Sequence, residues 1–168
     1  RLPLDVFPHA DGPLMRRLPY VTLTLAGCGV WMDLGRRHKE GAIMGRLDNK
    51  VAVVTGANSG VGAAIARLFA AEGAKVVMRC EAALEEVSAE IQAAGGETLV
   101  VPIDISKPED PERMMAAAEE KFGQIDILVN NAGILESGLK PVDRFTDEDL
   151  DRIIETNQKG TMRCMRAA

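Results

Sequence analysis

Residues 55–62 read Thr-Gly-Ala-Asn-Ser-Gly-Val-Gly, a run of glycine and small polar residues. The run follows an apolar segment, residues 51–54, and leads into a segment with helical spacing of apolar residues. Glycine permits backbone conformations closed to other residues, and the free N–H groups of a helix's first turn attract phosphate. A strand, a glycine-rich turn and a helix in this order therefore predict a bound nucleotide. The alternative is a strand-to-helix turn that needs glycines only for its own geometry.

The helix after this turn should end before Gly73, which suits the position just beyond a helix. Its apolar residues, Val61, Ile65, Leu68 and Phe69, recur at helical spacing and form one stripe. We therefore expect this stripe to pack on a sheet.

Strands and helices are predicted to alternate along the rest of the chain. The expected strands are residues 51–54, 75–78, 98–103 and 125–129, and the expected helices begin near residues 61, 82, 106 and 146. This alternation with short connections predicts an α/β fold, a doubly wound parallel sheet with right-handed crossovers.

Two of these helices carry further local signals. Residues 106–109 form a capping box with proline, which should open a helix that turns Met115, Ala118 and Phe122 inward and ends at Gly123.

For the last helix, Thr146 is the expected N-cap, with Asp149 as the acidic third residue of a capping box. This helix should show Leu150, Ile153 and Ile154 to the core.

The composition favours a single folded domain that binds a small ligand. The chain has 168 residues, of which 46% are hydrophobic, enough to bury a core. Its formal net charge is −5, and its basic residues form no cluster beyond adjacent pairs, which argues against nucleic acid as a partner. No apolar run reaches the roughly 18 to 20 residues needed to span a bilayer, so we expect no membrane span.

The three cysteines, Cys28, Cys80 and Cys164, are far apart and odd in number. They form neither a disulfide framework nor a Cys-x-x-Cys motif, so we expect no metal site and a reducing compartment, the cytoplasm. A weak secretory pattern, arginines at residues 16–17 followed by a short apolar stretch and Cys28, is the alternative.

Residues 1–43 mix proline, glycine, arginine and apolar residues without helical or strand spacing. We expect Met44 to be the true start and this extension to lie outside the domain, which we assign to residues 44–168. The alternative is an ordered extension that covers the edge of the sheet. We also expect the apolar strand at residues 125–129 to be left as an exposed edge, which is a predicted aggregation site.

Three features follow the ends of predicted strands: residues 55–62, Asp104, and residues 130–133, which read Asn-Asn-Ala-Gly. Ligands of doubly wound sheets bind beyond the carboxyl ends of the strands, so these features should gather in one crevice. Together with Asn157, they resemble in order and spacing the Thr-Gly-x-x-x-Gly-x-Gly, Asp, Asn-Asn-Ala-Gly and Asn motifs of the short-chain dehydrogenase/reductase family. The resemblance covers residues 44–168 and corresponds to the N-terminal part of the family.

The resemblance implies a Rossmann-type fold, here truncated at the C-terminus, that binds NAD or NADP. It also implies a full-length homo-oligomer that transfers hydride between the nicotinamide and a small carbonyl or alcohol substrate. The residues that would lie along the pyrophosphate are Gly56, Ser59, Gly60, Val61 and Gly62. Asp104 and Ile105 would meet the adenine. Asn131 and Gly133 would lie along the adenosine ribose and the floor of the crevice. For Asp104, the alternative is an Asx-type turn leading into Ser106.

Asn157 resembles the Asn of the family's Asn-Ser-Tyr-Lys tetrad, which supports a proton-relay water and the Lys, and is the catalytic residue expected in this chain. The alternative is a structural Asn whose amide bonds the backbone. The family's Ser and Tyr-x-x-x-Lys lie downstream of Ala168, and the single tyrosine, Tyr20, precedes the glycine-rich run. We therefore expect this chain to be inactive alone. A non-catalytic nucleotide-binding or regulatory protein is the alternative.

The connection after residues 75–78 bears on the choice between NAD and NADP. An acid at this place binds the ribose 2′-OH, and a base binds a 2′-phosphate. Here the connection begins with Arg79 and Cys80 and is shorter than in the family. Either Arg79 contacts a phosphate, or Cys80 occupies the discriminating position and Arg79 points elsewhere.

Overall fold

The structure of the protein is a computed structural model that describes residues 20–25, 28–33, 45–79, 84–135, 138 and 140–168. Within this part of the chain, six strands form one sheet in the spatial order β1-β2-β6-β3-β4-β5. The strands are β1 (Tyr20–Leu25), β2 (Cys28–Asp33), β3 (Val51–Val54), β4 (Lys75–Arg79), β5 (Thr98–Val101) and β6 (Ile127–Asn130). The helices are α1 (Gly60–Ala71), α2 (Leu84–Ala93), α3 (Asp110–Phe122), α4 (Asp147–Ile153) and α5 (Thr161–Ala167), with a short 3₁₀ turn, η2 (Val142–Arg144), and a π-helical segment, η3 (Ile154–Gly160). None of the described helices is both long and apolar enough to cross a membrane.

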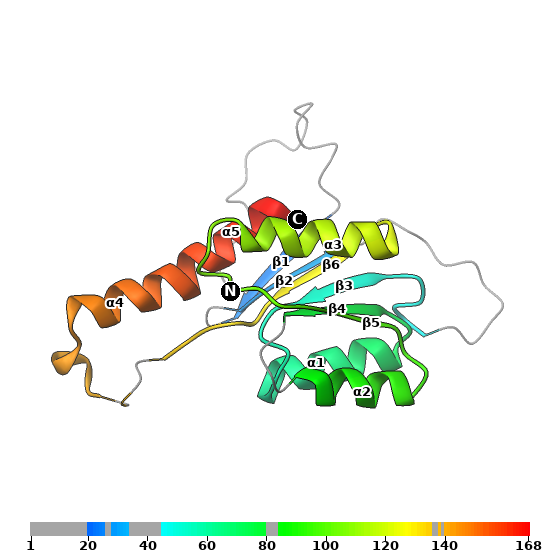
Figure 1. The fold of residues 1–168 in the computed structure, drawn as a ribbon, viewed down its shortest axis with the longest axis horizontal. Coiled ribbons are helices and arrows are strands. Elements are labelled where there is room, and N and C mark those ends of the chain that lie inside the picture. Colours follow the sequence, from blue (N-terminus) through cyan, green and yellow to red (C-terminus); the bar gives the residue numbers. More distant parts are fainter. Residues whose placement is uncertain (1–19, 26–27, 34–44, 80–83, 136–137, 139) are drawn as a thin grey trace, which may run out of the picture.

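The strands β6, β3, β4 and β5 run parallel to one another, whereas β2 runs antiparallel to β6. Helices α1 and α2 cover one face of the sheet, and α3 and α5 cover the other (Figure 1). This arrangement confirms the predicted doubly wound parallel sheet of the Rossmann type.

The central strand β3 shows why its sequence is a continuous apolar run. Because side chains alternate along a strand, Ala52 and Val54 pack in the cluster under α1 and α2, whereas Val51 and Val53 pack in the cluster under α3 and α5. Each side chain of β3 is therefore buried, as expected for a strand inside a parallel sheet with both faces covered.

Asp126 is a polar anchor at the amino ends of β3 and β6. Its buried carboxylate accepts the N–H of Val51 at 2.9 Å and pairs with the Lys50 ammonium at 3.1 Å. The side-chain amide of Gln124 donates to the same carboxylate at 2.7 Å. A buried charge needs such partners, so these contacts hold the start of β3 beside the segment that leads into β6.

The edge of β6 is paired in the structure. β2 runs antiparallel to β6 from Gly29 opposite Asn130 to Met32 opposite Ile127, and β1 pairs with β2. The prediction that this strand would be an exposed edge is therefore wrong, because backbone from the N-terminal extension satisfies it. The assignment of residues 1–43 to a region outside the domain stays a prediction, since residues 1–19 and 34–44 lie outside the described residues.

The apolar stripe predicted for α1 is only partly directed at the sheet. Ile65 and Phe69 pack against the core cluster, but Val61 and Leu68 are 67% and 53% exposed. The prediction is therefore wrong for Val61 and Leu68.

Small residues form the actual contact face of α1. Gly62, Ala63 and Ala66 are buried, because the tight glycine turn brings the start of the helix close to neighbouring backbone. A Cβ on Gly62 would lie 2.2 Å from the carbonyl oxygen of Gly56. The predicted end of α1 is confirmed, since Gly73 follows it with a φ of +93°.

The capping box predicted at residues 106–109 does not form. α3 begins at Asp110 with Pro111 in its first turn, and the N–H of Ser106 instead donates to the Asp104 carboxylate at 3.0 Å. The local Asx-type hydrogen bond competes with helix capping and is retained here. The inward face and the end of α3 are confirmed, with Met115 and Ala118 buried, Phe122 packed against the core and Gly123 left-handed.

The start of α4 is confirmed, but its buried face is not. Thr146 and Asp149 form the predicted capping box. Leu150 and Ile154 are exposed and Ile153 is only partly covered, so the prediction that they face the core is wrong. The reason is that α4 extends beyond the carboxyl ends of the strands, away from both core clusters (Figure 1).

We predict that Asp126→Ala lowers the free energy of unfolding by about 3 kcal/mol, because Lys50 keeps a charge without a partner and the Val51 N–H loses its acceptor. The measurement is the urea unfolding curve of the variant and the native chain. Asp143→Ala, at an exposed position in η2, is the matched control and should leave the curve unchanged. An Asp126→Ala curve that overlays the native one would contradict this account.

We also predict an acid-sensitive start of α4. The N–H of Thr146, the ammonium of Lys140 and the hydroxyl of Thr146 donate to Asp149 and lower the pKa of its carboxyl from 3.8 to about 2. Since the folded value is the lower one, this stabilisation is present above about pH 4 and is lost as the pH falls toward 2. Hydrogen exchange of the Asp149 N–H should therefore accelerate, beyond its intrinsic pH dependence, over that range. Asp149→Asn should abolish this extra acceleration.

Candidate nucleotide-binding cleft

A cleft of about 640 Å³ opens at the carboxyl ends of the parallel strands. This volume lies within the usual range for small-molecule sites. The loop after β3, the end of β4, the segment after β5, the segment after β6 and one side of α4 and η3 line it. The lining residues are Gly56, Asn58, Ser59, Gly60, Val61, Arg79, Asp104, Ser106, Asn131, Ala132, Gly133, Ile134, Arg152 and Thr156. The structure thus brings together the three features that the sequence placed at strand ends.

The glycine loop packs directly against the segment after β6. Gly56 has a φ of +66°, and a Cβ on it would lie 2.8 Å from the Cα of Ala132. Ser59 is the N-cap of α1, but its hydroxyl makes no capping bond, and no acidic residue lies in the first turn. The first-turn N–H groups of α1 therefore point their partial positive charge at the cleft without a competing carboxylate.

Two polar side chains join this loop to β6. The buried hydroxyl of Thr55 donates to the carbonyl of Val129 at 3.2 Å and accepts the N–H groups of Asn131 and Ala132 at 3.0 and 3.1 Å. The side-chain amide of Asn131 donates to the carbonyls of Thr55 and Gly56 at 3.2 and 2.9 Å. Asn131, which lines the cleft, and Thr55, which is buried, therefore both bond the loop to the segment after β6.

Asp104 lies in an Asx-type turn at the cleft wall. Its carboxylate accepts the N–H of Ser106, and its own N–H donates to Asp110 at 2.7 Å. Burial raises the pKa of the Asp104 carboxyl, but the hydrogen bonds from Ser106 and the charges of Arg79 and Lys107 outweigh it, so the pKa is lowered. The carboxylate is half-exposed and stays charged near neutral pH.

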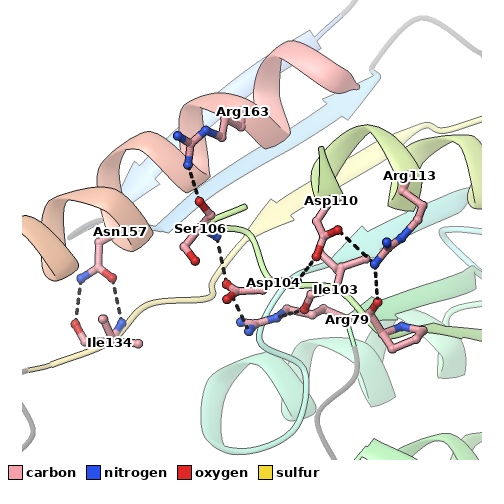
Figure 2. A network of polar contacts seen from close by, with 10 residues as sticks. Arg79, Ile103, Asp104, Ser106, Asp110, Arg113, Ile134, Asn157 and Arg163 are labelled. Atoms are coloured by element: carbon pink, nitrogen blue, oxygen red, sulfur yellow. Dashed lines mark hydrogen bonds and ion pairs between the residues drawn. The ribbon is translucent and has the colours of Figure 1, made fainter. Parts of the chain in front are cut away.

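Arg79 reaches from the end of β4 toward the same segment (Figure 2). Its Nε donates to the carbonyl of Ile103 at 2.7 Å, and one terminal nitrogen lies 3.9 Å from the Asp104 carboxylate. The side chain is only 15% exposed, yet it lines the cleft. Cys80, the other residue considered for the discriminating position, lies outside the described residues.

Asn157 lies on the π-helical segment η3 and bonds the backbone rather than facing the cleft. Its side-chain amide donates to the carbonyl of Ile134 at 2.9 Å, and its oxygen accepts the Ile134 N–H at 2.8 Å (Figure 2). Thr161 donates its hydroxyl to the Asn157 carbonyl at 2.8 Å. The structure therefore shows the backbone-bonded arrangement, with Asn157 held directly behind Ile134 and Gly133.

Three of the expected site residues do not line the cleft. Gly62 lies under the loop, Ile105 is buried in the core against Gly160, and Asn157 lies behind Ile134. The Ile105 side chain therefore belongs to the core rather than to the cleft lining.

Other lining residues were not expected. Ser106 and Ile134 adjoin motif positions, which was a signal that could have found them. Arg152 and Thr156 are one helical turn apart in a segment without a motif, so no local pattern indicated that they would line the cleft.

Comparison with known proteins places the chain in a family. Residues 50–168 match the family described as short chain dehydrogenase. Galactitol 2-dehydrogenase from Agrobacterium fabrum is 38% identical over 122 residues, which cover 73% of this chain and 46% of that enzyme. A 3beta-hydroxysteroid dehydrogenase from Mediterraneibacter gnavus is 39% identical over 128 residues, which cover 75% of this chain and 46% of that enzyme.

Solved structures agree with the match. A short chain dehydrogenase from Burkholderia cenocepacia, in complex with NADP, has a TM-score of 0.68 and 36% identity over 73% of this chain and 51% of that one. A short chain dehydrogenase from Mycobacterium avium has a TM-score of 0.69 and 35% identity over 74% of this chain and 47% of that one. The chain thus spans about half the length of the relatives it matches. By its motifs, its sheet and these matches, the chain belongs to the short-chain dehydrogenase family.

Proposed function

We propose that this chain binds NAD or NADP in the cleft and supplies the cofactor-binding part of an oxidoreductase that acts on a small carbonyl or alcohol substrate. The observation that carries the proposal is the cradle formed where the glycine loop meets the segment after β6. Positions Gly56 and Gly62 have no room for a Cβ, and the first turn of α1 opens onto the cleft. This combination suits a pyrophosphate, which needs close backbone approach and N–H donors.

In this proposal, each wall of the cleft holds a different part of the cofactor. Gly56, Ser59, Gly60 and Val61 hold the pyrophosphate, with Gly62 supporting the loop from behind. Asp104 and the backbone of Ile105 meet the adenine, and Asn131 and Gly133 lie along the adenosine ribose and the floor. The bound cofactor supplies hydride transfer at its nicotinamide, and the protein orients it.

Asn157 is proposed as the residue of this chain closest to the chemistry. Its paired bonds to Ile134 fix the segment that follows Gly133, which lines the cleft. Hydride transfer to a carbonyl also needs a proton donor matched to neutral pH. The tyrosine and lysine that serve this purpose by the family resemblance are not among these 168 residues, so we propose that the chain alone binds the nucleotide without turnover.

The wider role is proposed from the family. The names of relatives, galactitol 2-dehydrogenase and 3beta-hydroxysteroid dehydrogenase, indicate alcohols and ketones as the substrate class. We further propose that the full-length protein is a homo-oligomer and acts in the cytoplasm, without nucleic acid or membrane as a partner.

We predict that the 168-residue chain binds NADH or NADPH and that Gly56→Ala weakens this binding by at least about tenfold, because a Cβ at a φ of +66° meets Ala132 and displaces the loop. The measurement is a calorimetric titration, with circular dichroism to verify folding. Ala64→Val, at an exposed position of α1, should bind like the native chain. A folded native chain that binds neither dinucleotide would overturn the proposed function.

We predict that Arg79→Met weakens binding of NADPH more than binding of NADH. Arg79 is the cation of the cleft at the end of β4, where a 2′-phosphate gains a charge-assisted hydrogen bond. Competition titrations with both dinucleotides measure the ratio. The control is Arg67→Met, because Arg67 pairs with Glu90 outside the cleft lining. Equal losses for both dinucleotides would show that Arg79 acts only by holding Ile103 and Asp104.

A further inference from the structure

Arg163 joins the segment after β5 to η3, and both segments contribute residues to the cleft lining. It lies in α5, and its Nη1 donates to the carbonyl of Ser106 at 2.8 Å. Its other terminal nitrogen, Nη2, forms a short ion pair with Glu155 in η3. The Arg163 side chain is only 17% exposed, so water screens these contacts less than those of a surface arginine.

The Ser106 end of this bridge belongs to the wall that contains Asp104. The N–H of Ser106 donates to the Asp104 carboxylate, while Asp110 accepts the Asp104 N–H (Figure 2). The carbonyl of Ser106 therefore receives its donor from α5, on the other side of the turn. Arg163 and Asp110 therefore stabilise the same turn through different backbone groups, the Ser106 carbonyl and the Asp104 N–H.

The Glu155 end belongs to the segment that carries Asn157. Glu155 and Asn157 both lie in η3, and Asn157 grips Ile134 through two hydrogen bonds. Lys159 also pairs with Glu155, at 2.7 Å and one helical turn away. Glu155 thus keeps the Arg163 guanidinium aligned along the helix, and the same helix holds Ile134 at the cleft.

We propose that Arg163 is a positioning residue that fixes the distance between the Asp104–Ser106 wall and the Asn157–Ile134 pair, and so couples nucleotide binding at the first to order at the second. The coupling rests on the proposed function, because it requires an adenine nucleotide in the cleft. The bridge that Arg163 forms between Ser106 and Glu155, here called the clamp, does not rest on the proposed function, because it joins protein segments only. Nothing in the sequence marked Arg163, since its partners lie 57 and 8 residues away.

The matched control is Arg166, one turn further along α5. Its guanidinium lies 3.6 Å from Glu112, and both side chains are mostly exposed. Solvent screening makes such a pair weak. Arg166→Met removes the same charge from the same helix without touching either cleft wall.

The first test is hydrogen exchange of the ligand-free chain. Arg163→Met should accelerate exchange of the Ile134 and Ser106 N–H groups by roughly tenfold, the size expected from losing a hydrogen bond to a charged group. Arg166→Met should leave both exchange rates unchanged. Arg163→Lys keeps the charge but has one ammonium nitrogen in place of two terminal nitrogens, so its exchange rates should lie between those of the other two variants. Exchange in Arg163→Met equal to that in Arg166→Met would overturn the clamp, and circular dichroism verifies that each variant is folded.

The second test uses AMP, which carries an adenine but no nicotinamide. At saturating AMP, the native chain should show slowed exchange at Ile134, and Arg163→Met should not, even at concentrations that restore saturation. Equal protection of Ile134 in both proteins would overturn the coupling. If the native chain binds neither AMP nor NADH, the proposed function and the coupling both fail, while the exchange of the ligand-free chain still decides whether the clamp exists.

Discussion

The junction between the ends of β3 and β6 sets the shape of the cleft. Thr55 accepts two backbone N–H groups with one buried hydroxyl, and Asn131 donates to two carbonyls of the glycine loop. These bonds require the loop and the segment after β6 to touch, and contact at this distance excludes a Cβ at Gly56. The glycines, the threonine and the asparagine therefore satisfy one steric condition together. The direction of α1 follows from it, because the helix starts where the loop leaves this junction.

The two ends of the parallel sheet are held by different chemistry. At the amino ends, Asp126 pairs with Lys50 and the Val51 N–H in a buried contact whose partners are fully engaged. At the carboxyl ends, Ser59 has no capping bond and the first turn of α1 faces the cleft. Satisfied polar groups stabilise a fold, whereas unsatisfied donors at a surface are available to a ligand. The apolar strands between the two ends carry the packing, and the first turn of α1 opens onto the cleft at the carboxyl end.

The elements that the sequence predicted well are those set by neighbouring residues. The alternation of β3, β4, β5 and β6 with helices, the capping box at Thr146 and the helix ends at Gly73 and Gly123 depend on local spacing and backbone freedom. Tertiary contacts decided the rest. The exposed side chains of Val61 and Leu150 follow from how closely α1 approaches the sheet and how far α4 extends past it, and no local pattern encodes either.

The candidate site shows the same division between local and distant signals. Asp104 and Asn131 were found because each follows a strand within a motif. Arg152 and Arg163 were missed because their roles depend on where a helix crosses a loop many residues away. An arginine on a helix is ordinarily a solvated residue, and only burial and partners distinguish one that positions a wall.

The ionisable groups of the cleft suit binding better than proton exchange. Among the described residues that line it, the charged side chains are the Asp104 carboxylate, whose pKa is lowered, and the guanidinium groups of Arg79 and Arg152. The lowered pKa keeps the Asp104 carboxyl charged near neutral pH, so it can orient a ligand but cannot exchange a proton with a substrate oxygen there. The guanidinium groups of arginine are hydrogen-bond donors without an acceptor, which suits the binding of an anionic dinucleotide. Under the proposed function, hydride transfer would therefore need a proton donor supplied by groups other than these. Asn157 also suits a binding role, because its amide is not ionisable and its two hydrogen bonds fix the backbone of Ile134, which lines the cleft.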